Sequence, residues 1–183
     1  MRKIVAAINM TLDGYCDHTS ITPDDDLHQH YADLINDSDI ILYGRKTFHL
    51  MKYWQTLVEN PSGKNAMDEF AVVMDKIPKI VFSTTLNSTD WKSARLAQRN
   101  LKDEVAGLKQ QLGRSILVGS RSLILQLMKL NLIDEYQFCV HPVVAGSGLL
   151  LFENTDSRHE FKLINTKIFT SGAVVFYYEP TAK

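Results

Sequence analysis

The chain has 183 residues, of which 45% are hydrophobic and 22% charged, a composition typical of a globular protein with a sizeable core. Its formal net charge of -1 excludes the broad positive surface that nucleic acid or an anionic membrane attracts. No apolar run is long enough to span a bilayer, and the two cysteines form neither a metal-ligand pattern nor a disulfide framework. We therefore expect a cytoplasmic protein with no membrane or nucleic-acid partner.

In the first half of the chain, short apolar runs alternate with amphipathic stretches. Residues 3–10 and 39–44 predict buried strands. Between them, Thr22 predicts an N-cap and Pro23 the first position of a helix, with three aspartates in its first turn, where the helix dipole favours negative charge. Residues 45–54 predict a short helix or turn. Residues 65–77 predict an amphipathic helix that ends at Pro78.

The second half continues the alternation. Residues 79–85, 115–120 and 133–144 predict strands, and residues 87–97 a loop with a short strand. Residues 100–113 and 121–132 predict helices, the first with Gly113 as its C-cap. Residues 160–180 form two extended runs divided at Ser171–Gly172, which is typical of a hairpin. This order predicts one α/β domain over residues 1–183, with a mainly parallel sheet flanked by helices and an antiparallel C-terminal hairpin.

Three predicted strands end in residues that suit an anion. The strand at 39–44 ends in Gly44 and is followed by Arg45, Lys46 and Thr47, and the strand at 79–85 ends in Ser83, Thr84 and Thr85. The strand at 115–120 leads through Gly119, Ser120, Arg121 and Ser122 into a helix, whose free N–H groups attract phosphate. Each motif alone is also explained by turns or caps. Because the ends of parallel strands meet at one edge of a sheet, the three together predict a site for a phosphorylated dinucleotide.

Several motifs, in order, resemble the dihydrofolate-reductase-like superfamily. They are the run of residues 3–10 with TLDG at 11–14, the GRKT segment at 44–47, the LIDE segment at 132–135, and the segment from Pro142 to Phe152. The resemblance covers nearly the whole chain and is strongest to the reductase domain of the bifunctional riboflavin-biosynthesis deaminase–reductase. The zinc signature of the deaminase half is absent from the sequence.

The resemblance implies NADPH as the cofactor. By position, Gly44, Arg45, Lys46 and Thr47 would hold the pyrophosphate and the adenosine 2′-phosphate, and Ser83, Thr84 and Thr85 would share the 2′-phosphate. Gly119, Ser120, Arg121 and Ser122 would offer backbone and hydroxyl groups to the pyrophosphate, and the backbone of Ala6 and Ala7 would flank the nicotinamide amide. This chain has Gly119–Ser120 where the family carries two glycines.

Two carboxylates are candidates for the chemistry, because a carboxylate beside a nitrogen heterocycle can bind it or pass a proton through water. Asp13, in the loop after the first strand, is the first candidate, and its alternative role is that of a turn residue before Gly14. Asp26 is the second, and its alternative role is that of a first-turn helix carboxylate. Asn9, Leu27, Tyr31, Met51 and Trp54 are candidates for substrate contacts, with ordinary core or rim packing as the alternative. No metal-binding set is expected, because the histidines have no partners at ligand spacing.

Three functions remain open from the sequence. The first is an NADPH-dependent reductase of a small pyrimidine- or pteridine-like compound, similar to 5-amino-6-(5-phosphoribosylamino)uracil reductase. The second is dihydrofolate reductase, although the tryptophan that those enzymes carry before the helical proline is missing. The third is a catalytically silent nucleotide-binding dimer. The resemblance also implies a homodimer, in keeping with the long aromatic strands at the C-terminal end, whose edge needs cover.

Overall fold

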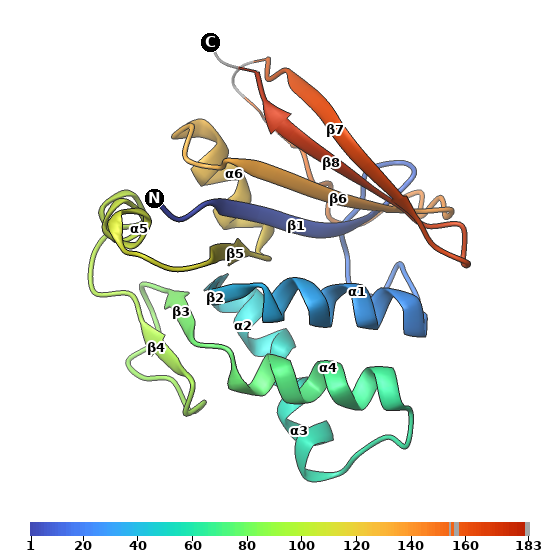
Figure 1. The fold of residues 1–183 in the computed structure, drawn as a ribbon, viewed down its shortest axis with the longest axis horizontal. Helices are drawn as coiled ribbons and strands as arrows, with labels where there is room; N and C mark the ends of the chain where they lie inside the picture. Colours follow the sequence, from blue (N-terminus) through green and yellow to red (C-terminus); the bar gives the residue numbers. More distant parts are fainter. Residues whose placement is uncertain (154, 156–157, 182–183) are drawn as a thin grey trace.

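The computed structural model describes residues 1–153, 155 and 158–181. Its eight strands form one sheet in the order β4-β3-β2-β5-β1-β6-β8-β7 (Figure 1). Six strands run parallel: β1 (Ile4–Thr11), β2 (Ser38–Gly44), β3 (Lys79–Phe82), β4 (Ala94–Leu96), β5 (Ser115–Val118) and β6 (Glu135–His141). The hairpin of β7 (Phe161–Ile168) and β8 (Val174–Pro180) joins the sheet antiparallel to β6. The predicted mainly parallel sheet with an antiparallel hairpin is confirmed.

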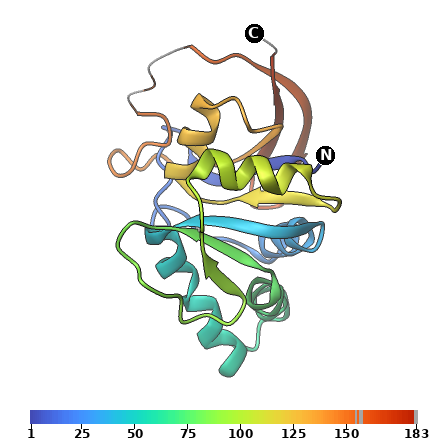
Figure 2. The same ribbon diagram turned by 90° about the vertical axis from the view of Figure 1, so that its left-hand side faces the viewer.

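Helices cover both faces of the sheet. One face carries α1 (Asp25–Asn36), α2 (Arg45–Met51), α3 (Tyr53–Glu59) and α4 (Asn65–Lys76), and the other carries α5 (Leu101–Gln110) and α6 (Arg121–Lys129). Figure 2 shows α5 and α6 in front of the sheet, with α1 behind it. None of the helices in the described residues is long and apolar enough to cross a membrane.

The first strand shows why the sheet has two apolar cores. Successive side chains of a strand point to opposite faces. Ile4 and Ala6 therefore join the core beneath α5 and α6, whereas Val5 and Ala7 join the core beneath α1 and α4. All four are buried, and burying a larger aliphatic side chain contributes about 1.5–3 kcal/mol. A strand in the middle of a doubly covered sheet must be apolar on both sides, which explains its continuous apolar run.

Several predicted boundaries differ from the structure. Helix α5 ends at Gln110 with Gln111 as its C-cap, so the predicted C-cap, Gly113, lies beyond the helix. The N-cap of α1 is Asp24 rather than Thr22, because the Asp24 carboxylate accepts a hydrogen bond from the backbone N–H of Leu27 at 2.8 Å. Pro23 therefore precedes the helix. Strand β3 ends at Phe82, and the next residues leave the sheet because Ser83 Oγ accepts the backbone N–H groups of Thr85 and Leu86.

Strands β1 and β5 separate at the edge that the sequence predicts for the cofactor. Their register runs from Ile4 and Ile116 to Ala6 and Val118, where β5 ends. Strand β1 continues to Thr11 and stays paired with β6. In the described pairings, the stretch of β1 from Ala7 to Thr11 thus has a strand partner on one side only, which leaves a fork between β1 and the start of α6.

Candidate functional site

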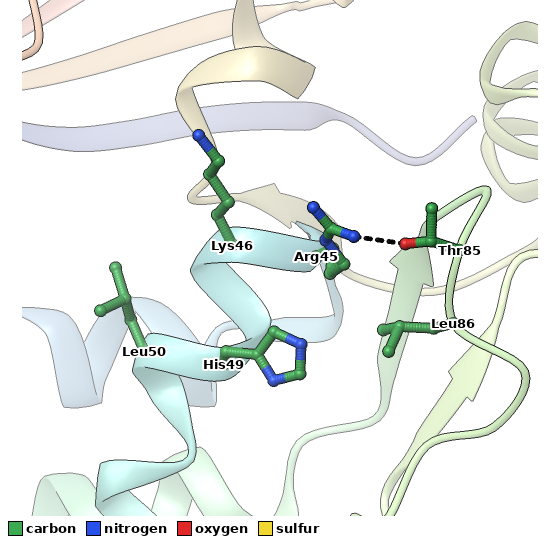
Figure 3. Close-up of a pocket in the computed structure, with 6 residues that line it drawn as sticks. All are labelled: Arg45, Lys46, His49, Leu50, Thr85 and Leu86. Carbon is green, nitrogen blue, oxygen red and sulfur yellow. Dashed lines mark hydrogen bonds between the residues drawn. The ribbon is translucent and has the colours of Figure 1, made fainter.

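A cleft of about 600 Å³ opens beside the end of β2. It is lined from α2 by Arg45, Lys46, His49 and Leu50, and from the loop after β3 by Thr85 and Leu86 (Figure 3). The Arg45 guanidinium donates a hydrogen bond to the Thr85 hydroxyl, which joins the two walls. The structure therefore brings together two of the three predicted phosphate-binding segments.

Within the described residues, the cations of this cleft have no protein counter-ion. Arg45 and Lys46 are both exposed, and within the described part of the chain neither forms an ion pair. By contrast, Lys52 at the start of α3 is paired with Asp90. Two unneutralised cations on one rim attract an anion, and a guanidinium is the side chain best shaped to bind phosphate.

At the start of the loop after β3, one hydroxyl group bonds to the loop backbone and two are exposed to solvent. Ser83 is half-buried, and its oxygen already accepts two backbone N–H groups of its own turn. Thr84 and Thr85 are exposed, and Thr85 faces Arg45. Of the three residues predicted to share a 2′-phosphate, Thr85 is thus the one that the structure places beside the cleft cation.

The ends of β2 and β5 meet at Gly44. The Gly44 N–H donates to the buried Ser120 Oγ at 2.9 Å, and a Cβ on Gly44 would lie only 3.1 Å from Ser122 Oγ. Ser120 is the N-cap of α6 but makes no side-chain bond to that helix, so the first-turn N–H groups lack a side-chain cap. An uncapped helix N-terminus is a ready anion-binding group. Half-buried Thr47 stands in the first turn of α2, beyond Gly44.

The side chain of Arg121 belongs to a different contact. Its guanidinium donates to the carbonyl oxygen of Leu150 and lies 3.3 Å from the Glu153 carboxylate. These bonds hold the loop after β6 against α6. The Arg121 side chain is therefore engaged within the fold, and the predicted contact of the Arg121 and Gly119 backbone with a cofactor stays a prediction.

A polar network lies on the α1 side of the fork. Asn9 Oδ1 accepts a hydrogen bond from the Tyr31 hydroxyl at 3.1 Å and lies 3.0 Å from His141 Nε2. Burial raises the pKa of Tyr31 well above its usual value and lowers the pKa of His141, which Asp24 partly offsets. A neutral His141 with its proton on Nε2 therefore donates to Asn9. Two donors on Oδ1 fix the Asn9 carboxamide, and its NH₂ group makes no bond within the described residues.

Asp13 ties two loops together. Its Oδ1 accepts the Thr11 hydroxyl at 2.6 Å and the Ala145 N–H at 3.1 Å, and its Oδ2 accepts the Gly146 N–H at 2.7 Å. The Thr11 hydroxyl, followed by these backbone groups, lowers the pKa of Asp13 to about 2. Asp13 is therefore ionised at neutral pH and is no proton donor there. Its predicted role in the reaction stays a prediction, as an acceptor of hydrogen bonds.

The other predicted residues form two groups. Exposed Asp26 accepts a hydrogen bond from the Thr170 hydroxyl of the β7–β8 turn at 2.6 Å, and Leu27 is buried beneath the same hairpin. Met51 and Trp54 are half-buried against the core beneath α1 and α4. The Trp54 ring packs against Phe70 with centroids 4.5 Å apart. Packing therefore accounts for Leu27 and Trp54, and a substrate contact by any of these residues stays a prediction.

Two residues that the structure makes prominent, His49 and His141, were not predicted from the sequence. His49 lines the cleft, and its signal was its spacing of four residues after Arg45, which puts both on one helix face. As a functional residue, His141 was considered only as a possible metal ligand, and its contact with Asn9 spans 132 residues of sequence, which no local pattern reveals. Across the described residues, no three His, Cys, Asp or Glu side chains form a group that could hold a metal ion.

Comparison with known proteins agrees with this architecture. The family model described as the RibD C-terminal domain matches residues 2–176. The uncharacterized protein YyaP of Bacillus subtilis is 34% identical over 181 residues, which cover 97% of this chain and 94% of that protein.

Two solved structures share the fold. A protein of Shewanella sp. PV-4, provisionally assigned to riboflavin biosynthesis, superimposes with a TM-score of 0.74 at 19% identity and covers 98% of this chain and 99% of its own. Dihydrofolate reductase of Enterococcus faecalis, solved with NADP(H), superimposes with a TM-score of 0.64 at 12% identity and covers 98% of this chain and 97% of its own. The fold is therefore dihydrofolate-reductase-like, as predicted.

Proposed function

The chain belongs to the RibD C-terminal domain family, and from this premise we propose that it is an NADPH-dependent reductase of a small pyrimidine- or pteridine-like compound. The observation that carries the proposal is the pair of unneutralised cations, Arg45 and Lys46, over a cleft next to the uncapped N-terminus of α6. A dinucleotide that carries an extra phosphate needs two anion sites. The cleft suits its 2′-phosphate, and the start of α6 suits its pyrophosphate.

The residues present fit such a cofactor. Gly44 leaves open the space that a Cβ would fill beside Ser122, so the backbone of β2 and α6 can approach a pyrophosphate closely. The fork beyond Ala6 leaves one flank of β1 without a strand partner in the described chain, which is where a planar carboxamide would meet the backbone of Ala7. When bound, the cofactor supplies the hydride.

The chain's own contribution is to orient the acceptor. Asn9, fixed by Tyr31 and His141, presents an amide donor on the α1 side of β1. Asp13 is ionised and holds the loop around Gly146 over the end of β1. We propose that these two groups bind the polar edge of the heterocycle, and that the proton that accompanies the hydride comes from water, because Asp13 cannot release one near neutral pH.

The test compares cofactors and acceptors side by side. NADPH and NADH affinities are measured by fluorescence titration, and turnover is followed by the absorbance of the reduced nicotinamide with 5-amino-6-(5-phosphoribosylamino)uracil and with dihydrofolate. We expect the protein to bind NADPH more tightly than NADH and to oxidise NADPH when the pyrimidine is the acceptor. Binding without turnover of either acceptor would favour a silent nucleotide-binding protein, and equal affinity for both cofactors would refute the proposal.

Arg45→Ala sharpens that test. A hydrogen bond to a charged group contributes roughly 1.5–3 kcal/mol, so NADPH affinity should fall about tenfold or more while NADH affinity changes little. Arg158→Ala is the matched control, because Arg158 is 86% exposed and pairs only with Glu160 in the described chain. Arg45→Lys retains the charge without the fork-shaped donor set and should lie between the two.

We also propose that the protein is a homodimer. Strand β7 pairs only with β8 among the described strands, and it exposes Leu163, Ile164 and Ile168 by 49%, 42% and 74%. An apolar edge of this kind needs cover. Light scattering should give twice the monomer mass, and Ile168→Lys should reduce it. A monomer mass for the unmodified protein at micromolar concentration would end the proposal.

A further inference from the structure

His49 shares the cleft with Arg45 but has no assigned role. It lies in the last turn of α2, four residues after Arg45, so the two side chains occupy the same face of the helix. Figure 3 shows its ring directed into the cleft, opposite Leu86 from the loop after β3. His49 is exposed and makes no hydrogen bond within the described residues. The ring is therefore available to a bound molecule.

The charges around His49 come from two elements. Arg45 and Lys46 stand on its own helix, and Asp90, in the loop after β3, is near enough for His49 to make a small contribution, after the larger one of Lys52, to its lowered pKa. Lys52 binds the Asp90 carboxylate, which offsets that negative charge. Histidine is the side chain that gains a positive charge as the pH falls from about 8 to 5. A charged imidazole at this position would add a third cation to the rim.

We propose that His49 is a specificity-determining residue that strengthens the preference for the 2′-phosphorylated cofactor as the pH falls. The inference rests on the proposed function, because it needs the 2′-phosphate to occupy this cleft. A phosphate held by Arg45 would lie within one helical turn of the His49 ring. Two unit charges 4 Å apart attract by about 1 kcal/mol in water, which corresponds to about fivefold in affinity. NADH lacks the phosphate and gains nothing from this charge.

The phosphate itself titrates in the opposite direction. A phosphate monoester loses its second negative charge near pH 6, so a cleft with only permanent cations should lose preference for the phosphorylated cofactor as the pH falls. The imidazolium of His49 opposes this loss. The informative quantity is therefore the difference between the protein and a His49 variant at each pH, not the pH profile of the protein alone.

The experiment measures NADP⁺ and NAD⁺ dissociation constants by calorimetry at pH 6.0 and pH 8.5, using the oxidised cofactors as probes. His49→Gln should lower the preference for NADP⁺ about fivefold at the lower pH and hardly at all at the higher pH. His49→Lys, which is charged at both, should retain the preference at both. His18→Gln is the matched control, because His18 is exposed in the loop after β1, outside the cleft.

Three results would overturn the inference. If His49→Gln weakens the binding of NADP⁺ and NAD⁺ equally, the ring contacts a part that both cofactors share, such as the adenine, and not the 2′-phosphate. If the variant keeps the preference of the unmodified protein at both pH values, His49 does not contact the phosphate, while the reductase proposal stands. If the unmodified protein binds neither cofactor at either pH, the proposed function fails together with the inference.

Discussion

The side chains of Ser120 and Ser122 both lie near Gly44. Their removal should nevertheless have opposite effects on stability and on cofactor affinity. Ser120 is 1% exposed, and its hydroxyl oxygen accepts the Gly44 N–H at 2.9 Å. Ser122 is exposed, stands near Gly44, and makes no side-chain hydrogen bond in the described residues. The sequence suggests cofactor binding for both. In the structure the Ser120 hydroxyl is bonded within the fold, whereas the Ser122 hydroxyl is available to a bound molecule.

Ser120→Ala removes the acceptor and leaves the Gly44 N–H unpaired in the interior. An orphaned buried donor costs about 1–3 kcal/mol, and the lower end applies if water reaches the vacated space. For a chain of this size, 1 kcal/mol corresponds to about 2–4 °C in melting temperature. We therefore expect the variant to melt about 2–12 °C lower than the unmodified protein. Its NADPH affinity, measured well below the melting range, should change little.

Ser122→Ala is the matched control, because it also removes a serine hydroxyl, two residues further along the chain. Exposed substitutions usually change stability by less than about 0.5 kcal/mol, so its urea midpoint should match that of the unmodified protein. The loss of a neutral hydrogen bond to the pyrophosphate is worth about 0.5–1.5 kcal/mol, which predicts up to about tenfold weaker NADPH binding.

Paired measurements decide the matter. Urea unfolding gives the free energy of unfolding of each variant, and fluorescence titration gives its NADPH dissociation constant. The reasoning is wrong if Ser120→Ala retains full stability, since the Gly44 N–H would then have no need of the hydroxyl. It is also wrong if Ser122→Ala is the less stable of the two.

Three further substitutions test the acceptor side and the core. Asp13→Asn should slow turnover about 10- to 150-fold, the change that corresponds to one hydrogen bond between the acceptor and a charged group; a lower melting temperature with normal turnover per folded molecule would show that Asp13 only joins the two loops. Burial, with a smaller effect from Lys167, lowers the pKa of His30 to about 4, so folding stability should fall as the pH drops from about 6.5 to 4, and His30→Gln should flatten that slope in urea titrations. Burial lowers the pKa of Lys79 to about 8, so the stability of the protein relative to Lys79→Met should rise between pH 8 and 10, and an unchanged difference would contradict it.

The sequence predicted the strands and helices well because their signals are local. The apolar run of β1 and the amphipathic pattern of α4 each report burial through neighbours in sequence. The start of α1 was misplaced for an equally local reason. Thr22, Pro23 and Asp24 are all good N-terminal residues, and only the bond from the Leu27 N–H to Asp24 decides among them.

The acceptor side of the site was harder to predict because it depends on distant contacts. Asp13 binds Ala145 and Gly146 across 132 and 133 residues of sequence, and Asn9 meets His141 across 132. A carboxylate before a glycine in a loop has the same local appearance whether it binds a ligand or another loop. The two backbone donors to Asp13 became visible only when the sheet placed the loops after β1 and β6 side by side.

This difference follows from how the fold builds its two anion sites and its acceptor site. A phosphate is bound by groups that one strand end carries by itself: a glycine, a cation, a hydroxyl and the first N–H groups of a helix. Gly44 with Arg45, and Gly119 with Ser122, each supply such a set within four residues, so a motif in the sequence suffices to predict them. In the proposed function the acceptor heterocycle meets Asn9 of β1, and the direction of the Asn9 carboxamide is set by its bonds to Tyr31 of α1 and His141 of β6. Cofactor class can therefore be inferred from the strand ends, whereas the identity of the acceptor depends on a network that changes with a single residue on any of three elements.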